Sequence, residues 1–262
     1  MHPELVHWGF IHIRSYGLML ALAFLTGTWI GLREAKRLSH DEDKVVNVIL
    51  IVLVASVLGA RALYVMEHVQ EFRREWGSVL ALWQGGLTLY GGIVAGTVAG
   101  LAAARRFGLP MWSVADALTP SLALGASIGR VGCYLNGCCY GRPTSLPWGV
   151  VFPPDSYAGL EFGNAKVHPS QLYLALAGLL LFVISWRLRR KVTVPGTLFW
   201  LFVILFALLR IPIDFTRAYE PEATLMRVRS YGITESQLTS LAIALFGLLM
   251  TLRLRHSAGT RV

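Results

Sequence analysis

The hydrophobic positions of this chain gather in long runs, and its polar and charged positions gather in the short segments between them. The runs approach the ~20 residues that a helix needs to cross ~30 Å of hydrocarbon. Their length and continuous apolarity predict helices rather than strands, because a membrane span must satisfy its own backbone hydrogen bonds. The predicted spans are Tyr16–Leu32, Val45–Tyr64, Leu87–Ala104, Val114–Ile128, Ser170–Trp186, Val194–Leu209 and Ser236–Leu252.

The fourth run is the shortest and holds Pro120 and Gly125. We expect it to form either a buried helix that its neighbours shield or a partly re-entrant segment. The expected count is therefore seven spans, with six as the alternative.

The third run carries Gly92, Gly96 and Gly100 at intervals of four residues. This spacing places all three on one helical face, where a second helix can approach closely. We expect this face to be a packing surface and not a site of chemistry.

The basic residues lie on alternate connections between the runs. The clusters are Arg33/Lys36/Arg37/Lys44, Arg105/Arg106, Arg187/Arg189/Arg190/Lys191 and Arg253/Arg255/Arg261. They hold more than half of the 24 Lys and Arg and, with their acidic neighbours counted, account for the whole net charge of +9. The positive-inside rule makes this side cytoplasmic.

The predicted fold is thus an all-α membrane protein, a bundle of about seven transmembrane helices with its N-terminus outside and its C-terminus in the cytoplasm. We expect one transmembrane domain over residues 1–262, with non-cytoplasmic loops at residues 67–86, 130–169 and 210–235. The first run has no basic segment before it and no small-residue cleavage site after it, so we expect it to be retained as a span.

Composition supports a membrane protein. Hydrophobic residues make up 55% of the chain, charged residues 15%, and the mean hydropathy is +0.55, whereas about 25% of residues are charged in an average soluble domain. The basic residues flank apolar runs and do not form a stripe interleaved with aromatic residues, so we expect a lipid bilayer as partner and no nucleic acid.

Most of the unusual polar residues lie at the predicted outer ends of the spans. These residues are Tyr16, Tyr90, Arg130, Asn136, His168, Gln171, Arg210, Asp214 and Arg217. Charges near hydrocarbon are costly and usually mark a pathway, a proton relay or a bound headgroup. The three arginines lack an equal number of acidic neighbours, and guanidinium groups fit phosphate bidentately, which favours a phospholipid headgroup as ligand.

Three of these features have simpler interpretations. Arg210 and Asp214 are four residues apart, so they could form an ion pair on one helical face that satisfies both groups. Arg130 could be a lone arginine that extends its charge toward the membrane surface. His168 precedes Pro169 at a helix start, which is an ordinary capping sequence.

The three cysteines, Cys133, Cys138 and Cys139, form one local cluster. Their spacing is a weak zinc pattern, because adjacent thiols rarely both reach one tetrahedral ion, although His168 could supply a nitrogen. Small packing residues, a disulfide outside the cytoplasm and a redox-active thiol are the other interpretations.

The segment from Gly129 to Gly141 reads G-R-V-G-C-Y-L-N-G-C-C-Y-G and resembles the signature G-R-x-G-N-F-x-N-x-E-x-x-G of the bacterial prolipoprotein diacylglyceryl transferases. Further segments resemble motifs of this family in the same order: Tyr16-Gly17, Gly85 to Gly92, Trp148 to Pro153, His168 to Tyr173, Arg210 to Arg217 and Ser236 to Leu241. They are spread over nearly the whole chain.

The chain departs from the family pattern at four positions. Tyr90 stands where the family has a histidine, and Cys133 stands where it has an asparagine. Cys138 and Leu174 each replace a glutamate. A tyrosine with a pKa near 10 is a poor general base at neutral pH, but it can donate a hydrogen bond to phosphate.

The resemblance implies transfer of the diacylglyceryl group of phosphatidylglycerol to the cysteine thiol of a prolipoprotein signal peptide, in a multi-pass protein of the bacterial inner membrane and without a metal or organic cofactor. It implies that Arg130 and Arg210 bind phosphate, that Asp214 orients Arg210, and that Tyr90 takes the place of the catalytic histidine. The implied substrate-binding residues are Tyr16, Arg130, Asn136, Gly141, His168, Gln171 and Arg217. The alternatives are a divergent family member with thiol or redox chemistry at Cys133, Cys138 and Cys139, and a transporter whose charges line a path.

Overall fold

The computed structural model describes residues 4–8, 11–73, 76–81, 85–219, 224–228 and 231–259, with side chains over 15–73, 76–81, 85–219 and 234–258. Parts of the loops expected at residues 67–86 and 210–235 lie outside the described residues, as does Arg261 of the last basic cluster.

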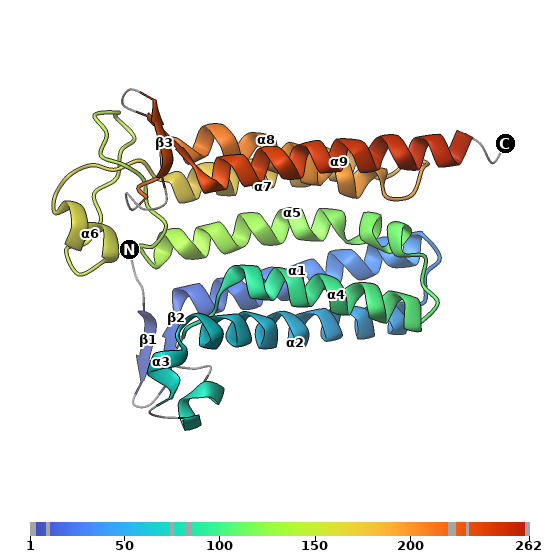
Figure 1. The fold of residues 1–262 in the computed structure, drawn as a ribbon, viewed down its shortest axis with the longest axis horizontal. Coiled ribbons are helices and arrows are strands. Elements are labelled where there is room, and N and C mark those ends of the chain that lie inside the picture. Colours follow the sequence, from blue (N-terminus) through green and yellow to red (C-terminus); the bar gives the residue numbers. More distant parts are fainter. Residues whose placement is uncertain are drawn as a thin grey trace. The chain divides into compact units, whose positions relative to one another are not determined.

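Each of the seven apolar runs forms a helix (Figure 1). These helices are α1 (Ser15–Arg37), α2 (Glu42–Glu67), α4 (Leu89–Arg106), α5 (Met111–Leu135), α7 (Ser170–Leu188), α8 (Thr197–Asp214) and α9 (Glu235–Gly259). Five are long and apolar enough to cross a membrane: α1, α2, α7, α8 and, over Glu235–Ala258, α9. The chain is therefore a predominantly helical membrane protein. Most helices extend past the predicted runs because their flanking polar residues continue the last turns.

Short elements fill the connections. Two antiparallel hairpins, β1 (Glu4–Trp8) with β2 (Ile11–Arg14) and β3 (Thr224–Val228) with β4 (Tyr231–Thr234), directly precede α1 and α9. The remaining short helices are α3 (Val69–Phe72), η1 (Trp76–Leu80) and α6 (Tyr157–Phe162). The sequence did not predict these hairpins, because four- and five-residue strands beside long apolar runs carry little pattern of their own.

The fourth run forms a continuous helix through Pro120, as the first of its two interpretations expects, and Pro120 itself is buried. α5 packs against α7, where the Ser127 hydroxyl donates to the Ala175 carbonyl at 2.8 Å. Gly178 makes this approach possible, because a Cβ there would lie 2.9 Å from the Ser127 nitrogen. Ser121 of α5 likewise faces Gly27 of α1.

The chain divides into two compact units, one of residues 1–31 with 115–262 and the other of residues 32–114. In the first unit α8 packs against both α7 and α9, and the orange α8 and red α9 run alongside each other in Figure 1. In the second unit the main packing is between α2 and α4.

The α2–α4 contact brings two backbones together. A Cβ on Gly59 would lie 2.6 Å from the Gly91 carbonyl oxygen and would overlap Ala95. The predicted glycine face of α4 points the same way: a Cβ on Gly92 would lie 3.1 Å from the Ser56 carbonyl oxygen, and one on Gly100 would lie 3.0 Å from Val52. The prediction of a close helix contact at this face is confirmed.

We expect Gly59→Ala to destabilise the protein by about 1–3 kcal/mol, the usual effect of overpacking, because the added methyl group meets backbone that cannot rotate away. Thermal unfolding in detergent, followed by size-exclusion chromatography, measures the change. Gly125→Ala in α5 is the matched control, since a Cβ added there would meet nothing within 4 Å. Equal melting of both variants would contradict the close contact of α2 and α4.

Candidate functional site

The chain turns sharply at the end of α5. Gly137 adopts a left-handed conformation with φ of 71° and donates its N–H to the Tyr134 carbonyl at 3.2 Å. The N–H of Cys138 donates to the Cys133 carbonyl at 3.1 Å. These two bonds form a Schellman motif, which ends a helix and brings the side chains three residues before and two residues after its cap into contact. Cys133 and Cys138 hold those two positions.

The segment after this turn is clamped between two others. The N–H of Gly141 donates to the His168 carbonyl at 3.0 Å, and the N–H of His168 donates to the Arg142 carbonyl at 3.0 Å. On the other side, the N–H of Arg142 donates to the Thr216 carbonyl at 2.8 Å, and its Nε donates to the Arg217 carbonyl at 2.9 Å. The segment after α5 therefore joins the start of α7 to the end of α8.

Gly141 is buried within this arrangement, and a Cβ there would overlap the backbone and side chain of His168. Gln171 secures the same loop: its Nε2 donates to the Cys138 carbonyl at 2.8 Å, and its side chain is fully buried. The Asn136 side chain lies close enough to the Cys138 thiol to affect its pKa. Gly141, Gln171 and Asn136 thus lie together in one loop core.

Asp214, the last residue of α8, is 1% exposed and accepts several hydrogen bonds. The Tyr219 hydroxyl donates at 2.5 Å and the Thr234 hydroxyl at 2.6 Å, while Ser236 contributes a longer contact of 3.4 Å. Burial and the bond to Asp214 raise the pKa of Tyr219, which keeps this phenol protonated as a donor. Asp214 therefore connects the C-terminal end of α8 to the start of α9.

The sequence spacing suggested an ion pair between Arg210 and Asp214. Among the described residues, no nitrogen–oxygen contact within 4.0 Å joins the two groups. Arg210 donates from Nε to the Ser236 hydroxyl at 3.0 Å, so Ser236 stands between the two charges. The remaining guanidinium donors of Arg210 make no hydrogen bond within the described part of the chain.

A capping box fixes Ser236. The N–H of Thr234 donates to the Gln237 side chain at 3.1 Å, and the N–H of Gln237 donates to the Thr234 hydroxyl at 3.3 Å. This reciprocal pair satisfies two backbone donors at a helix start. It also presents the Thr234 hydroxyl to Asp214, so the cap of α9 belongs to the site.

Two further arginines have unused donors. Within the described residues Arg130 makes no hydrogen bond and no ion pair, and the Nε of Arg217 is buried without a partner. The Arg217 guanidinium lies 4.7 Å from the ring centre of Tyr219. Unpaired buried donors carry an energetic penalty, so such groups usually serve a ligand or an ion.

Arg130 and Arg217 both lie within electrostatic reach of the Cys139 thiol. Hydrogen bonds from the Cys133 and Cys138 thiols, together with the charges of Arg217 and Arg130, lower the pKa of the Cys139 thiol. Tyr16 lies within electrostatic reach of Arg130 and of all three cysteines. The first turn of α1, the end of α5 and the segment after α8 thus meet around the turn that holds Cys133, Cys138 and Cys139, called the cysteine loop below.

Two other residues predicted for the site are His168 and Tyr90. The His168 Nδ1 lies 3.2 Å from the Tyr173 hydroxyl, which also accepts from the Trp148 indole at 2.8 Å, and burial lowers the pKa of His168. Tyr90 is the second residue of α4 in the other compact unit, and its side chain is 62% exposed.

Comparison with known proteins decides the family. A family model described as prolipoprotein diacylglyceryl transferase matches residues 3–253. The chain belongs to the prolipoprotein diacylglyceryl transferase family. The resemblance seen in the sequence motifs is thereby confirmed.

Curated family members agree over most of their length, and each is named phosphatidylglycerol–prolipoprotein diacylglyceryl transferase. The protein of Geobacter sulfurreducens is 34% identical over 254 residues, which cover 95% of this chain and 93% of that protein. The protein of a Nostoc species is 32% identical over 94% of this chain and 88% of its own length. The protein of Clostridium tetani is 30% identical over 83% of this chain and 86% of its own length.

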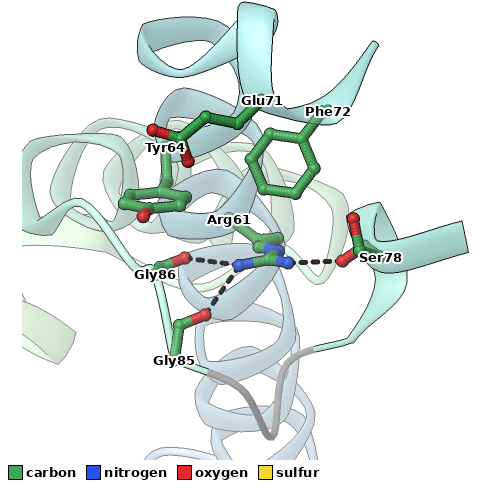
Figure 2. A pocket seen from close by; sticks show the side chains of 7 residues that line it. All are labelled: Arg61, Tyr64, Glu71, Phe72, Ser78, Gly85 and Gly86. Atoms are coloured by element: carbon green, nitrogen blue, oxygen red, sulfur yellow. Dashed lines mark hydrogen bonds between the residues drawn. The ribbon is translucent and has the colours of Figure 1, made fainter. Parts of the chain in front are cut away.

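A further buried charge of this diacylglyceryl transferase family member, Arg61, was not among the residues predicted for the site. Arg61 is buried near the end of α2, and its guanidinium donates to four backbone carbonyls, of which Figure 2 draws those of Ser78, Gly85 and Gly86. Nε donates to Val79 at 2.9 Å, Nη1 donates to Gly85 at 2.6 Å and to Gly86 at 3.0 Å, and Nη2 donates to Ser78 at 2.6 Å. A charged residue inside an apolar run was the available signal.

Figure 2 shows the Arg61 guanidinium between the Tyr64 and Phe72 rings, whose centres lie 5.7 and 5.2 Å away, in a cavity of about 270 Å³. Thr88 adds a second attachment: its N–H donates to the Ala60 carbonyl at 3.0 Å, and its hydroxyl donates to Glu67 at 2.7 Å. The connection that leads into α4 is therefore held on α2, which fixes the start of the helix that carries Tyr90.

We expect Arg61→Lys to loosen this connection, because a single ammonium group cannot span four carbonyls and each bond from a charged donor is worth about 1.5–3 kcal/mol. Hydrogen–deuterium exchange of the backbone at residues 85–88 should become faster by about tenfold or more. Arg105→Lys, at an exposed position in the last turn of α4, is the matched control. Unchanged exchange in Arg61→Lys would show that the guanidinium does not hold the segment.

Proposed function

We propose that this chain transfers the diacylglyceryl group of phosphatidylglycerol to the cysteine thiol of a prolipoprotein signal peptide. The observation that carries the proposal is the convergence of Arg130 and Arg217, each with unused donors, on one loop of a member of this transferase family. The named activity of its relatives supports the substrate pair.

The phosphate of the lipid is the proposed ligand of the arginines. Arg130 and Arg210 bind its oxygens through their unused N–H groups, and Arg217 adds a third positive charge. Asp214 orients Arg210 through the shared Ser236 hydroxyl rather than through a direct ion pair. The same buried carboxylate also holds the start of α9, so it sets where Arg210 points.

The remaining residues shape the headgroup site. Asn136 and Tyr16 donate hydrogen bonds to the headgroup, and Gly141 keeps the loop backbone close to it. Gln171 and His168 hold that loop from the start of α7, Gln171 through its bond to the Cys138 carbonyl. Tyr90 replaces the family histidine as a hydrogen-bond donor to phosphate and not as a general base.

The reaction forms one bond and breaks one. The sulfur of the peptide thiol bonds to the carbon of the diacylglyceryl group that carries the phosphate. The bond between this carbon and the phosphate oxygen breaks. Its electron pair leaves with the glycerol phosphate, which takes up the proton of the thiol. Negative charge grows on the phosphate oxygens in the transition state, and preorganised guanidinium groups stabilise such charge most where water is excluded.

This proposal includes a topology. Seven spans, α1, α2, α4, α5, α7, α8 and α9, form one transmembrane domain over residues 1–262 of a multi-pass protein in the bacterial inner membrane. The N-terminus and the loops 67–86, 130–169 and 210–235 lie on the non-cytoplasmic side, and the C-terminus is cytoplasmic. Basic residues in the last turns of α1, α4 and α7 support this orientation.

Alkaline phosphatase fusions test the topology, because this enzyme is active only outside the cytoplasm. A fusion after Gly163 should be active, and fusions after Gly108 and after Lys191 should be inactive. Equal activity after residues 108 and 163 would mean that α5 does not cross the membrane. Activity after residues 108 and 191, with none after residue 163, would reverse the orientation.

An assay of the purified protein with phosphatidylglycerol and a lipobox peptide tests the reaction. We expect wild type to form the thioether, Arg130→Ala to lower kcat by about 10²–10³, as for loss of one transition-state donor, and Tyr90→Phe to lower it by about tenfold. Arg187→Ala, at the opposite end of α7, is the control and should match wild type. A folded wild-type protein that forms no thioether would refute the activity and leave the family assignment intact.

A further inference from the structure

The three cysteine side chains form a cluster that the transfer reaction does not require. Their sulfur atoms all lie within 4.8 Å of one another, and these are the only cysteines of the chain. Cys133 is buried, and Cys138 and Cys139 are partly buried. Metal–sulfur bonds of about 2.3 Å place ligand sulfurs about 4 Å apart, so small side-chain rotations bring all three onto one ion.

The backbone builds this cluster. The Schellman motif at the end of α5 places Cys133 beside Cys138, whose thiol lies 3.7 Å from the Cys133 carbonyl. Cys139 has a left-handed backbone with φ of 58°, which is uncommon for any residue other than glycine, asparagine or aspartate. This turn directs the third sulfur back toward the first two and removes the usual obstacle to adjacent thiols sharing one ion.

Neighbouring residues hold the loop in this form. The Gln171 side chain bonds the Cys138 carbonyl at 2.8 Å, and Gly141 is fixed to the His168 backbone at 3.0 Å. A left-handed non-glycine residue persists only where its surroundings enforce it, and such strain gathers at ligand sites. The thiols are therefore prearranged.

The chemistry of this set selects a soft metal ion. Three thiolates are soft ligands of the kind that copper(I) and zinc prefer. No histidine, aspartate or glutamate of the described residues joins the group, whereas structural zinc takes four protein ligands. Arg130 and Arg217 act electrostatically on this loop, and their positive charges offset the excess negative charge of three thiolates around a monovalent ion.

We propose that Cys133, Cys138 and Cys139 form a three-thiolate binding site for a soft metal ion, with copper(I) as the ligand that fits best. Each thiol releases its proton to solvent as its sulfur binds the ion, and no oxidation or reduction takes place. The proposal goes beyond the transfer of diacylglyceryl groups and does not depend on it.

Competition with bicinchoninate tests the site on reduced, detergent-purified protein. Copper(I) should bind with a stoichiometry of one per chain, and X-ray absorption at the copper edge should show three sulfur neighbours. Each of Cys133→Ser, Cys138→Ser and Cys139→Ser should weaken binding by at least about tenfold, since even an outer-shell partner is worth about 10–100-fold. His256→Asn, in the last turn of α9, is the control for histidine binding and should leave the affinity unchanged.

A second measurement tests the site on folded wild-type protein, in case the serine variants fold poorly. Wild-type protein alkylated with N-ethylmaleimide after folding should lose copper binding while it keeps its melting temperature. Copper binding that survives alkylation or all three serine substitutions would overturn the site, and preference for zinc over copper in the same competition would overturn the copper assignment. Neither lipid nor peptide is present, so the result is separate from that of the transferase assay.

Discussion

The geometry of the site depends on a short run of backbone hydrogen bonds through Gly141 and Arg142. These residues pair with His168 on one side and with Thr216 on the other, so the segments after α5, before α7 and after α8 become one structure. Arg130 lies near the end of α5, close in sequence to the cysteines, and this pairing brings Arg217 to the cysteine loop from the segment after α8. A side chain at position 141 would occupy the space of His168, so the pairing requires glycine there.

The sequence predicted the helices well, because a span of apolar residues in a bilayer leaves the chain no other way to satisfy its backbone. It also predicted the contact at Gly92, Gly96 and Gly100, because glycines four residues apart leave room on one helical face for a second helix to approach. Spacing was less informative for Arg210 and Asp214. It put both on one helical face but could not reveal that Ser236, from a distant helix cap, would lie between them.

Other features depend on contacts or backbone angles that no local pattern encodes. The left-handed backbone of Cys139 answers the objection that adjacent thiols rarely meet at one ion, and nothing in the residue letters indicates it. Arg61 carried a readable signal as a charge within an apolar run, but its four carbonyl partners come from a connection whose path follows from the fold. Two of the departures from the family motif, Cys133 and Cys138, are neighbours in space, because the Schellman motif brings their side chains together.

The contact of α2 with α4 has a consequence for the traffic of lipids. Where Gly59 and Gly91 meet backbone to backbone, the seam between the two helices holds no space for an acyl chain. A phospholipid that approaches sideways from the surrounding leaflet, or a lipidated product that departs the same way, therefore cannot pass between α2 and α4 at this contact.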